Sequence, residues 1–305
     1  MKHASIEGFK IALASTFVNE ILPTSSRRTI NRNYMSKLQR PFFPDVEKLF
    51  SEYVESYGGN VVENLDENNT DKLNADYFFD SPLIVAELKT FKKDIFSIEE
   101  DFPRIQELYG KWLSSKKMTQ KQLREHIFKG KPLPTKCVQD LIERGSKTIE
   151  RAIHKANKQI ESTKKTLNCE QANGIIFLIN DGNYFFNNEG FLNIIANLIG
   201  RKFKESSFDV IIYLTINQAT YKEGSELDYN IWVPIYTKID DNGETIVSDE
   251  LHSFVNAFGE KFLTEFLTVK TGHQPKEFEQ IESIEDTIEE IKKHKFIPKG
   301  VIFKK

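Results

Sequence analysis

The sequence is poor in the residues on which several common enzyme classes depend. Among 305 residues there are only two cysteines, Cys137 and Cys169, and they lie too far apart for the spacing of a zinc site. The six histidines are scattered, without an H-E-x-x-H motif. The G-x-x-x-x-G-K-S/T and G-x-S-x-G motifs are missing as well. These absences argue against zinc chemistry, against an ATPase and against a serine nucleophile elbow.

Long apolar stretches are also missing. No run of about 18 apolar residues occurs, so the sequence predicts no membrane span. Residues 1–22 lack the basic start and the apolar block of a secretory signal. We interpret both cysteines as reduced thiols, which favours a cytoplasmic protein. The hydrophobic share of 39% and the charged share of 29% fit a globular protein with a proper core.

Charge is unevenly distributed along the chain, although the net charge is only −3. Residues 24–40 contain five basic residues and no acidic one, and residues 111–136 contain eight basic residues and one acid, Glu125. Residues 240–250 and 277–290 are acidic. Each basic stretch taken alone is more often an ordinary solvated surface. Together they would allow the chain to bind a polyanion through one face.

Helical patterns and apolar strand patterns alternate along the chain. This alternation predicts an α/β fold with a central mixed sheet covered by helices on both faces. Pro234 places the last strand at an edge of that sheet. The polar stretch at about 98–145 reads as a helical insertion. The expected helices span 44–57, 102–113, 119–128, 146–167, 191–203, 251–267 and 284–294, and the expected strands span 60–65, 74–80, 83–91, 174–180, 210–216 and 231–236.

The pattern that carries chemistry is Asp76 followed by Glu87 and Lys89. Side chains alternate along a strand, so Glu87 and Lys89 project from one face near the end of an otherwise apolar strand. A tight turn at residues 80–82 would join it to the preceding strand, which carries Asp76 near its start. Two carboxylates and one ammonium would then share a small volume. A carboxylate pair suits Mg²⁺ or Mn²⁺, and an adjacent lysine can orient or help to deprotonate a metal-bound water.

Residues 44–91 resemble the core of the PD-(D/E)XK, or restriction-endonuclease-like, nucleases. The order helix, strand, strand with Asp76, then strand with Glu87 and Lys89 is similar to the αβββαβ core of that family. An E-x-K triplet by itself is usually a solvated pair, so the resemblance depends on its place in this order. This sequence departs from the family motif at Ala75, because the motif has proline at the position before the aspartate. In the family, the aspartate and the glutamate bind Mg²⁺ and the lysine serves the hydrolytic water, and these are the roles that the resemblance implies here.

The resemblance extends to about residue 180. The expected helix at 146–167 and the strand after it match the next helix and the fourth strand of the family core, and Gln159 matches a glutamine that many members direct into the active site. Glu47, on the first helix, is the candidate for the further catalytic glutamate that some members carry there. Gln159 could equally be an ordinary surface side chain, and Glu52 and Glu55 are the alternatives to Glu47 on the same helix. The implied organisation is an N-terminal helical and basic segment at 1–43, a nuclease core at 44–180 that contains the insertion, and a C-terminal α/β extension at 181–305 packed on the same sheet.

The resemblance implies an endonuclease or exonuclease that depends on Mg²⁺ or Mn²⁺. DNA is the first expectation for the substrate, and bacterial restriction or phage defence is the implied context. Two alternatives stay open at this stage. The chain could be a catalytically weak nucleic-acid-binding or assembly subunit with the same fold, or it could cleave RNA or tRNA. A partner subunit or a homo-oligomer is compatible with all three, and no membrane partner is expected.

The insertion supplies the expected contacts to nucleic acid. It is spliced between the strand of Glu87 and the helix of Gln159, so its ends should be anchored beside the proposed centre. Binding to nucleic acid is dominated by neutralisation of phosphates. The residues expected to hold the substrate backbone are Lys116, Lys117, Lys121 and Arg124. The alternative for the same stretch is a solvated helical hairpin or a surface for a protein partner.

Overall fold

The computed structural model describes nine ranges of the chain: 42–64, 74–92, 98–183, 187–203, 205–218, 220–222, 228–238, 245–272 and 284–296. The basic stretch at 24–40, with almost all of the expected N-terminal segment, lies outside these ranges. None of the described helices is long and apolar enough to cross a membrane.

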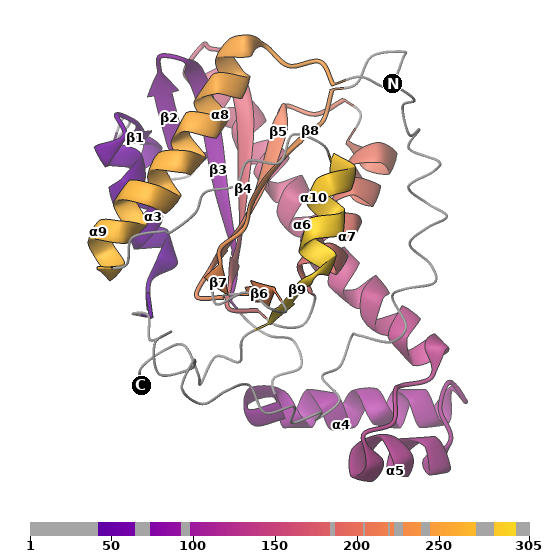
Figure 1. Cartoon of the computed structure of the whole chain (residues 1–305). Coiled ribbons are helices and arrows are strands. Elements are labelled where there is room, and N and C mark those ends of the chain that lie inside the picture. Colours follow the sequence, from indigo (N-terminus) through magenta and orange to yellow (C-terminus); the bar gives the residue numbers. More distant parts are fainter. Residues whose placement is uncertain are drawn as a thin grey trace.

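A mixed sheet of six strands forms the centre of the structure (Figure 1). Its first three strands are antiparallel, its third to fifth strands are parallel, and its last strand, which carries Pro234, is an antiparallel edge as expected. The α/β fold with a mixed sheet is therefore confirmed. In spatial order the strands are β1 (Asn60–Val61), β2 (Tyr77–Asp80), β3 (Leu83–Phe91), β4 (Asn173–Asp181), β5 (Val210–Ile216) and β8 (Trp232–Tyr236).

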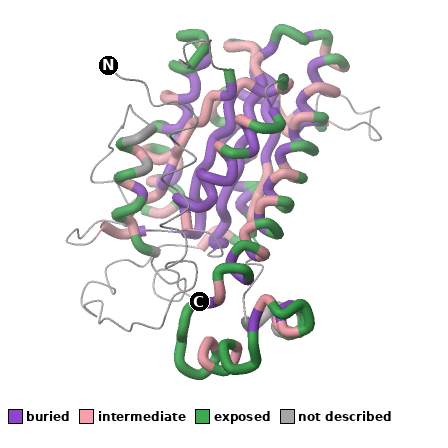
Figure 2. The backbone as a smooth tube through the Cα atoms, turned by 90° about the vertical axis from the view of Figure 1, so that its right-hand side faces the viewer, coloured by how far each residue is buried: buried purple, intermediate pink, exposed green. Residues whose placement is uncertain are grey.

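Helices cover both faces of the sheet because the inner strands are apolar on both sides. On β3, Ile84 and Ala86 face one hydrophobic core while Val85 faces the other, and all three are fully buried. Figure 2 shows these strands buried between helices whose outer sides are exposed. One core is closed by α3 (Val46–Ser56) and α8 (Asp249–Lys261), which continues through η2 (Phe262–Phe266) into α9 (Leu267–Thr271). The other core is closed by α6 (Thr135–Thr166), α7 (Asn188–Lys202) and α10 (Ile284–Lys292).

The largest error in the expected elements concerns the helix α6. We expected it to begin at Ser146, after Gly145, but it is continuous from Thr135 and includes Gly145 as a buried residue. A single glycine costs a helix only about 1 kcal/mol, which the long buried stripe of α6 outweighs. The helix begins after Pro134. Proline has no backbone N–H and its ring clashes with the preceding turn, so it is tolerated best at the start of a helix. The expected start of this helix at Ser146 is therefore wrong, and eleven residues assigned to the insertion belong to α6.

Smaller differences occur at short elements. The strand expected at 60–65 ends at Val61 and passes into the turn η1 (Val62–Asn64). A second, three-stranded sheet was not expected, because its strands are too short to show a periodic pattern. It consists of β6 (Thr220–Lys222), β7 (Asp228–Tyr229) and β9 (His294–Phe296).

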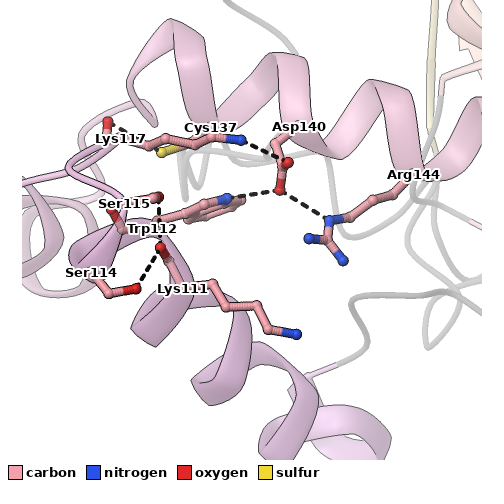
Figure 3. A network of polar contacts seen from close by, with 8 residues as sticks. All are labelled: Lys111, Trp112, Ser114, Ser115, Lys117, Cys137, Asp140 and Arg144. Atoms are coloured by element: carbon pink, nitrogen blue, oxygen red, sulfur yellow. Dashed lines mark hydrogen bonds and ion pairs between the residues drawn. The ribbon is translucent and has the colours of Figure 1, made fainter.

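The insertion is a pair of helices at the start of α6, away from the sheet (Figure 1). They are α4 (Ile98–Ser114) and α5 (Gln120–Lys129), and Thr119 begins α5 with a capping box to Gln122. Figure 3 shows how they are anchored: the carboxylate of Asp140 on α6 accepts hydrogen bonds from Lys117 Nζ at 2.9 Å and from the buried Trp112 Nε1 at 2.9 Å. Arg144 Nε donates a third at 3.0 Å.

We expect Asp140→Ala to loosen the insertion without unfolding the sheet. The change leaves the buried indole N–H of Trp112 without an acceptor, which should lower local stability by about 1–3 kcal/mol. Burial tends to raise the pKa of Asp140, but the bonds from Lys117, Trp112 and Arg144 outweigh burial and hold this pKa well below its usual range. The network should therefore stabilise the fold above the unfolded-state pKa of about 3.9 and lose its effect as the pH falls further.

Limited proteolysis checks the prediction for Asp140. Cleavage between α4 and α6 should be faster in Asp140→Ala than in the wild type, and the exposed neighbour Glu143, changed to alanine, is the matched control. Equal cleavage rates in the two variants would contradict the anchoring role of Asp140.

Candidate active site

The side chains of Glu87 and Lys89 lie on the face of β3 that is covered by α6. Glu87 is completely buried, and Lys89 is 18% exposed at the margin of the same face. The Lys89 ammonium donates to Glu87 Oε1 and, at 3.0 Å, to Gln159 Oε1 on α6. The structure therefore brings together the strand pair and the helix glutamine that the sequence singled out.

Asp76 joins this group from the residue just before β2. Its carboxylate accepts a hydrogen bond from Leu88 N at 2.7 Å, at the point of β3 where the pairing with β2 has ended. Its backbone carbonyl accepts from Val62 N at 2.9 Å. The strand expected at 74–80 therefore begins only at Tyr77, because Asp76 uses its side chain, and not its backbone, to meet β3.

Two side chains of α6 hold the segment before β2 in place. Gln159 Nε2 donates to Asn74 O at 2.7 Å, and Thr163 Oγ1 accepts from Ala75 N at 2.7 Å. Thr163 is 1% exposed and Gln159 is 8% exposed, so both bonds are shielded from water. Sequence reasoning did not single out Thr163. Its role in positioning Asp76 depends on a contact between residues 88 positions apart, which no local pattern shows.

We expect Thr163→Val to destabilise the protein through this contact. Valine fills the same space but leaves the buried N–H of Ala75 without an acceptor, which should cost about 1–3 kcal/mol of unfolding free energy in urea. Thr148→Val is the matched control, because Thr148 is an exposed residue of the same helix, and it should cost less than about 0.5 kcal/mol. Similar costs for the two variants would show that the bond to Ala75 does not stabilise the segment.

Electrostatics set the two carboxyl groups apart from ordinary surface acids. Burial, together with the negative charge of Asp76, raises the pKa of Glu87 to about 8, and the nearby Lys89 only partly opposes this. Burial also raises the pKa of Asp76, despite the hydrogen bond from Leu88 and the charge of Lys89. Two carboxylates this close cannot both ionise without a further cation. The site therefore favours either a shared proton or an added positive charge.

The donor atoms fit a hard divalent cation. Glu87 Oε2 is buried, and no residue in the described part of the chain donates a hydrogen bond to it. A buried carboxylate oxygen without a hydrogen bond is unfavourable unless it is protonated or binds a cation. Among the described residues, no group of three or more acids, histidines or cysteines is arranged so that it could hold a metal ion. Two carboxylates are nevertheless enough for Mg²⁺, which usually keeps several waters and takes its remaining oxygens from substrate phosphate.

Glu47 lies at the margin of this group and not inside it. It is exposed on α3, and its Oε1 accepts a hydrogen bond from Thr90 Oγ1 at 2.8 Å. Its charge is close enough to help raise the pKa of Asp76. From this position Glu47 could approach a substrate or a second water. The position is less suited to ligating the same cation as Asp76 and Glu87.

Comparison with protein-family models, with curated proteins and with solved structures finds no match. The geometry of the chain itself therefore carries the functional argument.

The four basic residues expected to hold the substrate lie far from this centre. They belong to the insertion or to the loop before α5, and the insertion is anchored at Asp140, which precedes Gln159 on the same helix by about 28 Å at a rise of ~1.5 Å per residue. The expectation that both ends of the insertion are anchored beside the centre is therefore wrong for its C-terminal end, because α6 is continuous and carries that end away. Lys117 is also bound to Asp140, whereas Lys116, Lys121 and Arg124 are exposed.

Proposed function

We propose that the chain is a metal-dependent nuclease of the PD-(D/E)XK type that hydrolyses phosphodiester bonds, with DNA as the first substrate. The order of elements supports this proposal. Helix α3 is followed by the antiparallel strands β1, β2 and β3, then, past the insertion of α4 and α5, by α6 and by β4 parallel to β3, an order similar to the αβββαβ core of that family.

The observation that carries the proposal is the meeting of four side chains from three elements. Asp76 comes from the entry to β2, Glu87 and Lys89 come from β3, and Gln159 comes from α6. A chance E-x-K triplet on a strand would be solvated. Here its glutamate is fully buried, its lysine is hydrogen-bonded to a nearly buried glutamine, and both lie beside a second carboxylate.

Each residue has a distinct part in the proposed reaction. Asp76 and Glu87 would hold Mg²⁺ or Mn²⁺, which supplies Lewis-acid stabilisation of the scissile phosphate and lowers the pKa of bound water. The bond from Leu88 N fixes the direction of the Asp76 carboxylate. Gln159 and Glu87 hold the Lys89 ammonium, so that Lys89 can direct its protons toward the attacking water or the developing charge on the phosphate.

The decisive experiment is incubation of the purified chain with supercoiled DNA, linear DNA, single-stranded DNA and RNA, with and without Mg²⁺ or Mn²⁺. The proposal expects cleavage of DNA only when a divalent cation is present. Cleavage of RNA alone would change the substrate class but keep the centre. Binding of nucleic acid without any cleavage would favour a catalytically weak binding subunit, and the nuclease proposal would be withdrawn.

A further inference from the structure

The outer face of α5 combines exposed cations with an exposed aromatic ring. Lys121, Arg124 and Phe128 are spaced by three and four residues, so they lie on one side of the helix. The opposite side of α5 packs: Leu123 lies against the core, and the His126 ring contacts Tyr109 of α4 with ring centroids 6.2 Å apart. Phe128 is 81% exposed, although the other side of the same helix packs against neighbouring residues. We call Lys121, Arg124 and Phe128 the outer face of α5.

The positive charge around this face exceeds the acid that balances it: Glu125 lies four residues from Lys121 and from Lys129 on the same helix and interacts with both charges. The one acid in residues 116–136, Glu125, is 3.1 Å from Lys131, and Lys117 is paired with Asp140. The other basic side chains of this stretch are exposed, and the described residues give them no ion pair. They are Lys116, Lys121, Arg124, Lys129 and Lys136. An excess of positive charge over the nearby acids raises the local affinity for a polyanion.

We infer that the outer face of α5 is a second nucleic-acid contact, at which Lys121 and Arg124 hold phosphates and Phe128 stacks on an unpaired base. Base stacking on an exposed aromatic side chain, beside a basic track for the backbone, is how proteins hold single strands. The inference deepens the proposed function and rests on it for the substrate. A nucleic acid fits this face better than a protein partner, because the exposed apolar surface is limited to Phe128 and Ile127 in the described insertion while the cations around it are numerous.

The distance along α6 indicates that this contact falls away from the bond at the active centre. The anchor at Asp140 is about 28 Å from Gln159 along the helix axis, which corresponds to roughly eight base pairs at ~3.4 Å per step. The bonds of Asp140 to Lys117 and Trp112 hold the insertion to the helix. The face on α5 should therefore engage unpaired bases that are several positions away from the bond at the active centre. A duplex that carries a single-stranded or frayed segment away from the cleaved bond has the substrate form that this arrangement favours.

The test measures binding without cleavage. The full chain, in buffer without divalent cations, is titrated against a fluorescein-labelled single strand and against a duplex of the same sequence, each of about 30 positions, so that both contacts can be spanned. Phe128→Ala should weaken binding of the single strand by about tenfold, the size of one stacked base, and binding of the duplex by less than about twofold. Phe128→Trp should restore single-strand binding. Val269→Ala is the matched control, because Val269 is an 83% exposed apolar residue on α9, on the other side of the sheet.

A second pair of variants tests the basic part of the face. Lys121→Glu with Arg124→Glu should weaken binding of both probes and reduce the slope of log affinity against log salt by about one to two. Lys261→Glu with Lys270→Glu changes the net charge equally, on α8 and α9, and should leave the slope unchanged.

The inference and the proposed function fail differently. If Phe128→Ala binds the single strand as tightly as Val269→Ala does, or loses duplex binding equally, the stacking contact is overturned, whether or not the chain cleaves DNA. If the Phe128 and Lys121 variants behave as expected in a chain that shows no metal-dependent cleavage, the contact stands and the nuclease proposal falls.

Discussion

Replacing Glu87 with glutamine is expected to abolish metal-dependent cleavage and, at the same time, to raise the melting temperature of the metal-free protein. The carboxyl group is fully buried next to Asp76, and burial with that negative charge raises its pKa to about 8. Glutamine has the same shape, but it has neither a charge to bury nor a proton to take up on folding, so the metal-free fold should gain stability at neutral pH. The same change removes one of the two proposed metal ligands, and a loss of several kcal/mol of transition-state stabilisation corresponds to a loss of about 10³-fold or more in rate.

Thermal unfolding separates this expectation from a general loss of folding. Saturating Mg²⁺ should raise the melting temperature of the wild type, because a ligand that binds only the folded state stabilises it, and should leave that of Glu87→Gln unchanged. Asp76→Asn should behave in the same way, since its amide oxygen can still accept the bond from Leu88. Asp80→Asn is the control, because Asp80 is an exposed acid on the same hairpin. Unchanged cleavage by Glu87→Gln or by Asp76→Asn would remove that residue from the proposed centre.

The parts of the site that could be predicted from sequence are those set by local periodicity. Glu87 and Lys89 share a face because side chains alternate along any strand. The tight connection between β2 and β3 forms as expected, with Asp80 paired to Leu83, and this brings Asp76 next to Leu88. The position of Gln159 follows from the apolar stripe of α6, which directs one side of the helix to the sheet.

The parts that could not be predicted depend on contacts between distant residues or on the length of a helix. The bond from Ala75 N to Thr163 and the ion pair of Lys117 with Asp140 join segments that no pattern relates. The charge count predicted that the insertion is positively charged, but it could not predict where the insertion lies relative to the site. That position depends on α6 continuing through Gly145. A basic stretch that is close to a site in sequence can therefore be several turns of helix away from it in space.

Replacing Lys89 with alanine is expected to remove most of the turnover while metal binding remains. The Lys89 ammonium lies between Glu87 Oε1 and Gln159 Oε1 and contributes no oxygen to a cation. Its charge competes with a bound cation for Glu87, so its removal should leave the affinity for Mg²⁺ equal or slightly higher. The catalytic loss should be about 10²–10⁴-fold in kcat, the usual contribution of a positioned proton donor or acceptor. Gln159→Ala, which removes one of the two groups that orient the ammonium, should lose less.

Calorimetry with Mg²⁺ and single-turnover cleavage of the same preparation decide whether Lys89 acts in the transition state. Lys92→Ala is the matched control: Lys92 follows the same strand, is exposed, and donates to the carbonyl of Pro44 at 2.8 Å. It should change neither metal binding nor kcat by more than about twofold, since it has no contact with the carboxyl pair. A lysine that acts only on the reaction lowers kcat without lowering metal affinity. If metal binding disappears together with activity in Lys89→Ala, the lysine instead maintains the shape and charge of the carboxyl pair, and another group must serve the attacking water.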